Sequence, residues 1–271
     1  MKSMKNTLPF SHPCFSNETL HTSRIHLAVA PKCNIRCNFC RPTVDVCAHG
    51  CAPGITARLY SPNEALAHLR LVIKSGVDIQ IVGIAGPGEP LFNEETFETI
   101  QLVKAVFPYI HICLSTNGLL LPGQMERIVE LGIRTLTVTV NAASAEVGEM
   151  IYSVKGRDGI EGVRLLMHNQ LAGIKMAAKA GLFVKVNTVY VPGINDHEIK
   201  GIAAITKEHG AYIHNILSVI PRGRFADIVP PDKAALKKMQ DDAGTYLTQF
   251  LKCRHCRADA VIDGRLKMQA R

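Results

Sequence analysis

The chain has 271 residues, of which 47% are apolar and 20% charged, and its formal net charge is +8. This length fits one large α/β domain better than two small ones, because α/β barrels of this size fold as single units. Trp is absent and no basic run is interleaved with aromatic residues, so we expect no nucleic-acid partner despite the positive charge. The first residues contain no apolar run long enough for a signal peptide or a membrane span. We therefore expect a cytoplasmic protein with no membrane partner.

Strand-like and helix-like segments alternate from about residue 24 to residue 250. The strand-like segments are short, rich in β-branched residues and bounded by turn residues, and they cover 24–30, 78–86, 109–115, 134–141, 182–191 and 211–220. Helical patterns follow them at 65–76, 93–107, 122–132, 159–181, 197–210 and 232–251. A capping box from Ser61 to Glu64, with Pro62 at the first helical position, predicts the start of the first helix.

Six β-then-α units predict a parallel sheet with helical crossovers. Because there are six units rather than eight, we expect an open, partial TIM-like barrel of the α/β class. Further cysteines stand before and after these units. We therefore divide the chain into an N-terminal extension at 1–23, a barrel at 24–250 and a cysteine-containing tail at 251–271, and expect both ends to lie over the barrel mouth.

Three of the nine cysteines, Cys33, Cys37 and Cys40, directly follow the first predicted strand in a C-x3-C-x2-C pattern. Cysteines in a reducing compartment indicate metal ligation or thiol chemistry rather than disulfides. In parallel α/β architectures ligands bind beyond the C-terminal ends of the strands, so we expect these thiols in the mouth of the barrel. Zinc sites and iron–sulfur clusters normally take four protein ligands. A zinc knuckle is the alternative, but this spacing is uncommon for zinc.

The triad after the first strand and the Gly-rich stretch GPGEP after the second resemble the radical S-adenosylmethionine (SAM) superfamily, and the resemblance extends over nearly the whole chain. It implies a partial (β/α)6 barrel in which the triad holds three irons of a 4Fe–4S cluster while the fourth iron binds SAM. It also implies that the methionine amino group of SAM meets Gly86, Gly88 and Glu89. The strand-end residues best placed for the carboxylate and ribose are Ser115, Asn117 and Asn141, although Asn117-Gly118 is also an ordinary turn signal.

A more specific resemblance is to the NifB family of nitrogenase cofactor biosynthesis proteins. It is carried, in this order, by HPCFS, APKCNIRCNFC, VGIAGPGEPL, HICLSTNGL, KVNTVYVPGIND, HNILSVIP and CRHCRADAV. It implies a lyase- or transferase-type maturation enzyme that fuses two accessory 4Fe–4S clusters and inserts a SAM-derived carbide, which gives the eight-iron precursor of the nitrogenase cofactor. The implied partners are SAM, an iron–sulfur cluster donor protein, an electron donor and a cofactor carrier or scaffold protein.

The same resemblance implies ligands for the two accessory clusters, because thiolate and imidazole both bind iron. One set comprises Cys14, Cys253 and Cys256, and the other comprises His12, Cys47 and Cys113. Cys51 competes with Cys47 for its role, and we favour Cys47. His21 is a possible substitute for His12. We expect the backbone to satisfy His26, at the start of the first strand.

Two other functions are compatible with the sequence. The chain would be a different radical SAM enzyme if its accessory cysteines held auxiliary clusters and its substrate were a peptide or a small molecule. It would be a non-catalytic iron–sulfur scaffold if it collected clusters and passed them on. Formation of 5′-deoxyadenosine under reducing conditions distinguishes an enzyme from a scaffold.

Overall fold

A computed structural model describes residues 12–18, 20–45, 52–253 and 255–265 of the chain. Its centre is a curved sheet of seven strands in the order β10-β9-β7-β6-β5-β1-β11. Six strands are parallel: β1 (Ser23–His26), β5 (Ile79–Ile84), β6 (His111–Thr116), β7 (Thr135–Thr139), β9 (Phe183–Tyr190) and β10 (Ile213–Ser218). Each overlaps a predicted strand, so the predicted partial barrel of six parallel strands is confirmed.

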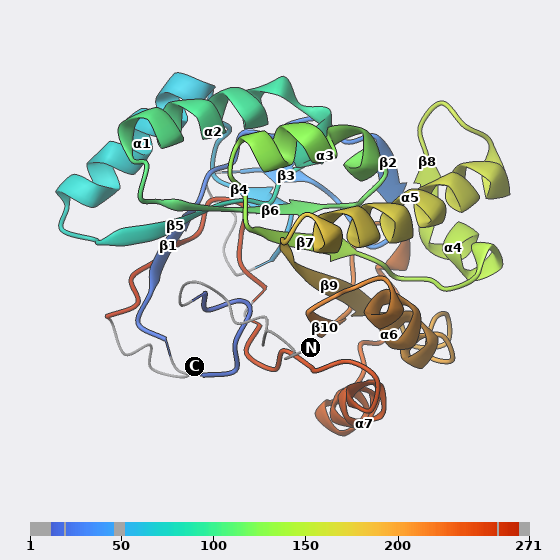
Figure 1. Cartoon of the computed structure of the whole chain (residues 1–271). Coiled ribbons are helices and arrows are strands. Elements are labelled where there is room, and N and C mark those ends of the chain that lie inside the picture. The colour runs from blue at the N-terminus through green and yellow to red at the C-terminus, as the bar shows by residue number, and fades with distance from the viewer. Residues whose placement is uncertain (1–11, 19, 46–51, 254, 266–271) are drawn as a thin grey trace, which may run out of the picture.

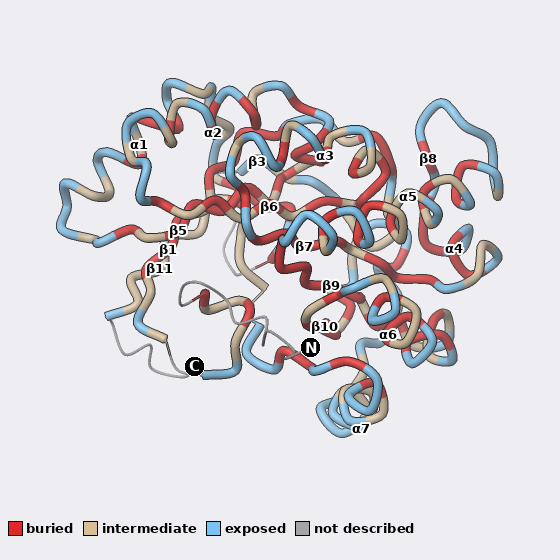
Figure 2. The backbone as a smooth tube through the Cα atoms, viewed as in Figure 1, coloured by how far each residue is buried: buried red, intermediate tan, exposed pale blue. Residues whose placement is uncertain are grey.

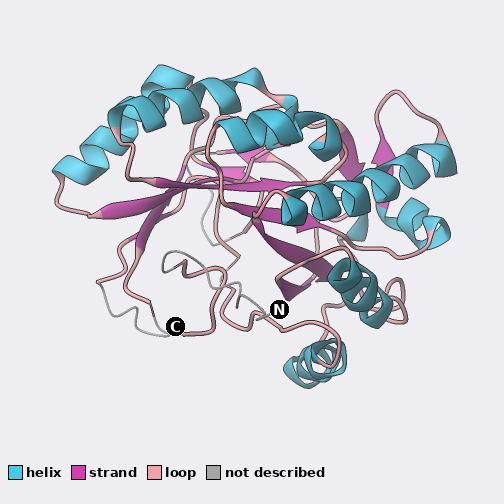
Figure 3. Ribbon diagram, viewed as in Figure 1, coloured by secondary structure: helices cyan, strands magenta, loops and turns pink. Residues whose placement is uncertain are grey.

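Helices cover the outer, convex face of this sheet (Figure 1; Figure 3). They are α1 (Pro62–Lys74), α2 (Glu94–Val106), α3 (Leu121–Glu130), α4 (Ala145–Ile151), α5 (Gly159–Lys179), α6 (Ile199–Glu208) and α7 (Lys233–Gly244), with short 3-10 turns η1 (Pro90–Phe92) and η2 (Gly223–Phe225). The capping box at the start of α1 is present, with the Ser61 backbone N–H donating to the Glu64 carboxylate at 2.8 Å. No helix among the described residues has both the length and the apolar character needed to cross a membrane.

The structure departs from the sequence predictions in its short elements. The predicted helix at 232–251 ends at Gly244, because the segment after it pairs with β10: the Phe250 N–H donates to the His214 carbonyl at 2.6 Å. Two small strand pairs were not predicted, β2 (Ile35–Cys37) with β8 (Tyr152–Val154) and β3 (Thr43–Val44) with β4 (Ile55–Thr56). These strands and α4 are too short to show a hydrophobic period.

The two faces of the sheet differ in chemistry because side chains alternate along each strand. One face packs under the helices, and its residues, such as Leu114, Val138 and Val186, belong to the main hydrophobic core (Figure 2). The concave face carries Cys113, Ser115 and other polar residues. The concave side of the barrel is therefore where ligands can meet polar groups of the chain.

The first and last described segments, 12–18 and 255–265, lie along this concave side (Figure 1). Phe15 packs against Phe183 and Ile213, the first residues of β9 and β10. The tail adds β11 (Val261–Ile262), which pairs antiparallel with β1. The extensions therefore also reach down inside the barrel toward the N-terminal ends of the strands, beyond the mouth where we expected them. The three-part division of the chain stays a prediction.

Candidate active site

The cysteine triad lies on the loop that follows β1. Cys37 is in β2, and the Cys40 N–H donates to the Cys37 carbonyl at 3.0 Å. Burial raises the pKa of all three thiols, to about 11 for Cys40, and the charges of Cys33 and Cys40 raise that of Cys37 further. The structure therefore brings the three predicted thiols together in a desolvated site. Metal binding would have to displace their protons, as it does at other thiolate sites.

The Gly-rich loop after β5 packs directly on the cysteine loop. The Gly88 N–H donates to the Ala30 carbonyl at 2.7 Å, and the Glu89 N–H donates to the Lys32 carbonyl at 2.9 Å. A Cβ on Gly88 would lie 2.2 Å from the Lys32 oxygen, so a glycine is needed for this approach. Gly86 has a φ of +131°, a second position that favours glycine. These glycines shape the backbone beside the triad, and their predicted contact with SAM stays a prediction.

Glu89 is buried, and its carboxylate accepts three hydrogen bonds from the protein. It accepts hydrogen bonds from the Thr116 hydroxyl at 2.5 Å, the Asn117 N–H at 2.7 Å and the Leu91 N–H at 3.1 Å. Burial raises the pKa of Glu89 to about 7, and these hydrogen bonds oppose the rise. The carboxylate therefore fixes the end of β6 against the Gly-rich loop. Its predicted contact with the amino group of SAM stays a prediction.

The polar strand-end residues differ in how freely they face the barrel interior. The Asn117 side chain donates to Asn34 Oδ1 at 2.7 Å and accepts from the Leu119 N–H at 2.9 Å. Asn141 is buried, and its Oδ1 accepts from the Val189 N–H at 2.8 Å. Ser115 is half-buried on the concave face, and its hydroxyl forms no hydrogen bond within the described residues. Ser115 is thus the predicted polar contact whose side chain is most available.

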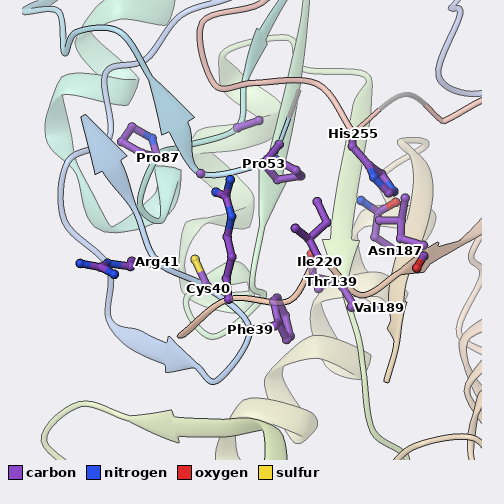
Figure 4. A pocket seen from close by; sticks show the side chains of 16 residues that line it. Phe39, Cys40, Arg41, Pro53, Pro87, Thr139, Asn187, Val189, Ile220 and His255 are labelled. Carbon is purple, nitrogen blue, oxygen red and sulfur yellow. The ribbon is translucent and has the colours of Figure 1, made fainter. Parts of the chain in front are cut away.

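A cavity of about 220 Å³ opens beside Cys40 at the C-terminal ends of the strands (Figure 4). Its polar lining includes Thr139 from β7, Asn187 from β9 and Ser218 from β10. Its apolar lining includes Phe39 and Ile220. Hydroxyl and amide groups beside apolar surfaces suit a ligand that combines a ribose with a flat base.

Sequence analysis missed the polar residues of this cavity. Thr139 and Asn187 are paired neighbours on β7 and β9, and the Asn215 side chain donates to Asn187 Oδ1 at 2.9 Å. Asn187 stands within KVNTVYVPGIND, one of the stretches that carry the family resemblance. What the sequence did not reveal was the strand register, which turns these side chains toward the cavity.

The accessory cysteines among the described residues gather lower on the concave side. Cys14 and Cys113 pack on the cluster formed by Phe15 and Phe183. Burial raises the pKa of Cys113 to about 11, and the charge of Cys14 adds to the rise. Burial also raises the pKa of Cys256, with smaller contributions from the charges of Cys14 and Cys253. Cys14 therefore adjoins members of both predicted ligand sets, whereas Cys47 and Cys51 lie outside the described residues.

The three histidines His12, His21 and His26 differ in their hydrogen bonds. His12 Nδ1 accepts from the Cys14 N–H at 3.1 Å, so the neutral ring carries its proton on Nε2 and is poorly prepared to bind iron there. His21 is exposed, with Nδ1 3.1 Å from the Gly264 carbonyl. His26 Nδ1 lies 2.9 Å from the Arg257 carbonyl, which can only accept, so Nδ1 is protonated and Nε2 keeps its lone pair.

His26 therefore has the arrangement typical of a metal ligand, in which the second ring nitrogen donates to a carbonyl. Burial lowers its pKa to about 4, which keeps the ring neutral. His26 is paired in register with Gly83, and Gly83 is paired with Cys113. A Cβ on Gly83 would lie 2.6 Å from His26 Cδ2, so the absence of a side chain there allows the imidazole to lie against β5, on the side of Cys113. We had expected the backbone to satisfy His26; the Arg257 carbonyl does so at one nitrogen only.

The thiols and imidazoles of this region offer donor atoms that suit iron. No three His, Cys, Asp or Glu side chains of the described residues surround one point as the ligands of a single ion do. Thiolates that hold a cluster bind different irons and therefore stand further apart. The desolvated thiols and the neutral imidazole of His26 are suitable donors for iron.

Comparison with known proteins identifies relatives over most of the chain. A model of the Radical SAM superfamily matches residues 27–204. The chain is 42% identical over 259 residues to the FeMo cofactor biosynthesis protein NifB of Methanocaldococcus jannaschii, covering 92% of this chain and 85% of that protein. It is 35% identical over 263 residues to the NifB of Azotobacter vinelandii, covering 93% of this chain and 52% of that protein. The solved structure of Streptococcus suis SuiB shares the fold, with a TM-score of 0.60 and 14% identity over 86% of this chain and 50% of that one.

Glu89→Gln should remove a pH dependence from the free energy of unfolding of the cluster-free protein. Folding raises the pKa of Glu89 from 4.5 to about 7, so its contribution to stability is full below about pH 4.5 and is lost as the pH rises through 7. The shift corresponds to about 3 kcal/mol. Anaerobic urea denaturation of both proteins between about pH 5 and about pH 8 measures it. Parallel stability curves for wild type and variant would contradict the prediction.

Proposed function

Because the chain belongs to the NifB family of the radical SAM superfamily, we propose that it matures the nitrogenase cofactor by joining two 4Fe–4S substrate clusters around a carbon derived from SAM. The observation that carries this proposal is the second group of thiols, Cys14, Cys113 and Cys256, which lies on the same concave side as the triad. A radical SAM enzyme with one cluster and a small substrate has no need of such a group.

Cys33, Cys37 and Cys40 would hold the resident 4Fe–4S cluster and leave one iron for SAM. When bound, that cluster supplies the electron that cleaves SAM reductively to a 5′-deoxyadenosyl radical. The cavity beside Cys40 would receive the adenosine part of SAM, with Thr139 and Asn187 as hydrogen-bonding partners. The partly buried surroundings of the three thiols would limit the access of water to this region.

The remaining cysteines and one histidine would hold the substrate clusters. Cys14, Cys253 and Cys256 form one set, and Cys113 and Cys47 form the other with His26 in place of His12. The neutral tautomer of His26 and its position opposite Cys113 support this exchange. Neither set reaches four ligands, which suits a cluster that is consumed and released rather than retained.

The proposed function also requires other proteins. An iron–sulfur donor would supply the substrate clusters, an electron donor would reduce the resident cluster, and a carrier or scaffold protein would accept the product. We propose that these exchanges take place in the cytoplasm, where a reducing environment keeps the thiols free for iron.

Replacing Cys33, Cys37 and Cys40 together by Ala should abolish formation of 5′-deoxyadenosine from SAM. The physical reason is that iron without its three thiolates has no site beside the cavity. The measurement is chromatography of the reaction products after anaerobic reconstitution and reduction with dithionite. Persistent reductive cleavage of SAM by this variant would overturn the assignment of the triad.

Replacing Cys253 and Cys256 together by Ala should lower the bound iron by about one cluster, roughly four atoms per chain. The variant should still form 5′-deoxyadenosine, because the triad is untouched, but it should make no fused cluster. Iron analysis and product chromatography on the same reconstituted sample check both parts. Full iron content, or continued formation of the fused cluster, would contradict the role of the tail.

His26→Ala should remove an imidazole from a substrate cluster, whereas His12→Ala should not. The reason is that only His26 has a lone pair on Nε2 while Nδ1 donates to a backbone carbonyl. Pulsed electron paramagnetic resonance of the reduced protein should show nitrogen hyperfine coupling in wild type and in His12→Ala, and should lose it in His26→Ala. The opposite pattern would restore His12 as the ligand.

A further inference from the structure

Two cations are buried on the concave side, within the region of the accessory thiols. Arg24 is 8% exposed and Lys185 is 6% exposed. One Arg24 amino group donates to Cys256 Sγ at 3.6 Å. The Lys185 ammonium lies 5.4 Å from the centre of the Phe15 ring and 5.2 Å from that of Phe250. Both cations thus stand where the two chain ends meet the sheet.

No carboxylate side chain of the described residues neutralises either cation. Neither Arg24 nor Lys185 forms an ion pair there, and the Arg24 Nε–H is buried without a hydrogen bond among these residues. The residues that the structure does not describe include no Asp or Glu. They are 1–11, 19, 46–51, 254 and 266–271. Aromatic rings offset only part of the cost of burying an ammonium. The folded chain therefore holds two positive charges in a site without a matching anionic side chain.

The groups around these cations are those proposed to hold iron. The charges of Lys185 and Arg24 both lower the pKa of Cys113, opposing the larger effect of burial, and Arg24 acts in the same direction on Cys256. Lys185 follows Val184 on β9 and pairs in register with Thr137, the neighbour of Ser115. Lys185 therefore stands one row of side chains from Cys113 and on the way to the cavity. A 4Fe–4S core is itself positive, but three thiolates outweigh that charge, so the cluster proposed for Cys14, Cys253 and Cys256 is anionic. The cluster proposed for two thiolates and a neutral imidazole becomes anionic when it is reduced.

We propose that Arg24 and Lys185 form a buried cationic pair that binds anionic iron–sulfur species between the two ends of the chain. This inference rests on the proposed function and adds how the substrates are held. A cluster that must be fused and released cannot be fixed by a full set of protein ligands. Electrostatic attraction in a low-dielectric site retains it without further bonds to iron. The two positive charges are therefore balanced when a cluster is bound and unbalanced in the empty protein.

The test compares neutral and charge-conserving variants of the full chain. Lys185→Met and Arg24→Met, alone and together, remove the charges while keeping an unbranched apolar stem. Lys185→Arg and Arg24→Lys keep the charges. Lys175→Met on α5 and Arg70→Met on α1 remove charges from exposed positions and serve as matched controls. Each protein is reconstituted anaerobically with ferrous iron and sulfide, desalted and analysed for iron, and the thermal midpoint of each cluster-free protein is measured.

We expect wild type, the controls and the charge-conserving variants to retain about three clusters, roughly twelve iron atoms per chain. The neutral double variant should lose roughly four or more of those iron atoms. The cluster-free Lys185→Met protein should unfold at a higher temperature than wild type, by about 2–4 °C, because an unmatched buried charge has been removed. Full iron retention by the double variant would overturn the cationic pair. A lower thermal midpoint in Lys185→Met would also overturn it, since the lysine would then stabilise the empty fold. Wild type that retains only about four iron atoms would instead refute the proposed function.

Discussion

One buried carboxylate joins the loops at the mouth of the barrel, and the position of the cysteine triad depends on it. Glu89 accepts from Thr116 and Asn117 at the end of β6, and Asn117 in turn holds Asn34, the neighbour of Cys33. On the other side, Asn93 binds both the N–H and the carbonyl of Lys32. The cysteine loop is thus fixed by amide groups before and after its first thiol. Preorganisation of this kind lets the protein receive a cluster without rebuilding its backbone.

Much of this arrangement could be predicted from the sequence, because it depends on local patterns. β-Branched segments bounded by turns mark the six parallel strands, the Ser61 capping box marks α1, and the C-x3-C-x2-C spacing places the triad after β1. The remaining features depend on register or on hydrogen bonds between distant segments. Ser115 and Thr116 are adjacent in sequence, yet one faces the barrel interior and the other binds Glu89. The tautomer of His26 is set by Arg257 near the other end of the chain, which no local pattern reveals.

The register of the strands also fixes where Cys113 stands relative to the cavity. Register places Thr139 and Asn187 beside the cavity, Thr137 and Lys185 in the next row, and Thr135 in the row of Cys113. Each row advances by two residues, roughly 6.6 Å along a strand. Cys113 therefore lies about two rows from the cavity, and the row between them carries the polar side chains Ser115, Thr137 and Lys185. This row of polar side chains is separate from the main hydrophobic core, which lies on the other side of the sheet.

The missing strands of the barrel are what admit the ends of the chain. A closed barrel of eight strands fills its interior with packed side chains and leaves no free edge. Among the described residues, the outer edge of β1 is covered by the two-residue strand β11 alone, through the pairs Arg24 with Ile262 and Ile25 with Val261. The same pairing brings the tail alongside Arg24, which donates to Cys256. The pairing of β11 with β1 therefore both covers the sheet edge and brings the tail thiols to the concave side. A chain without the tail would lose both the cover of β1 and the thiols that the tail supplies.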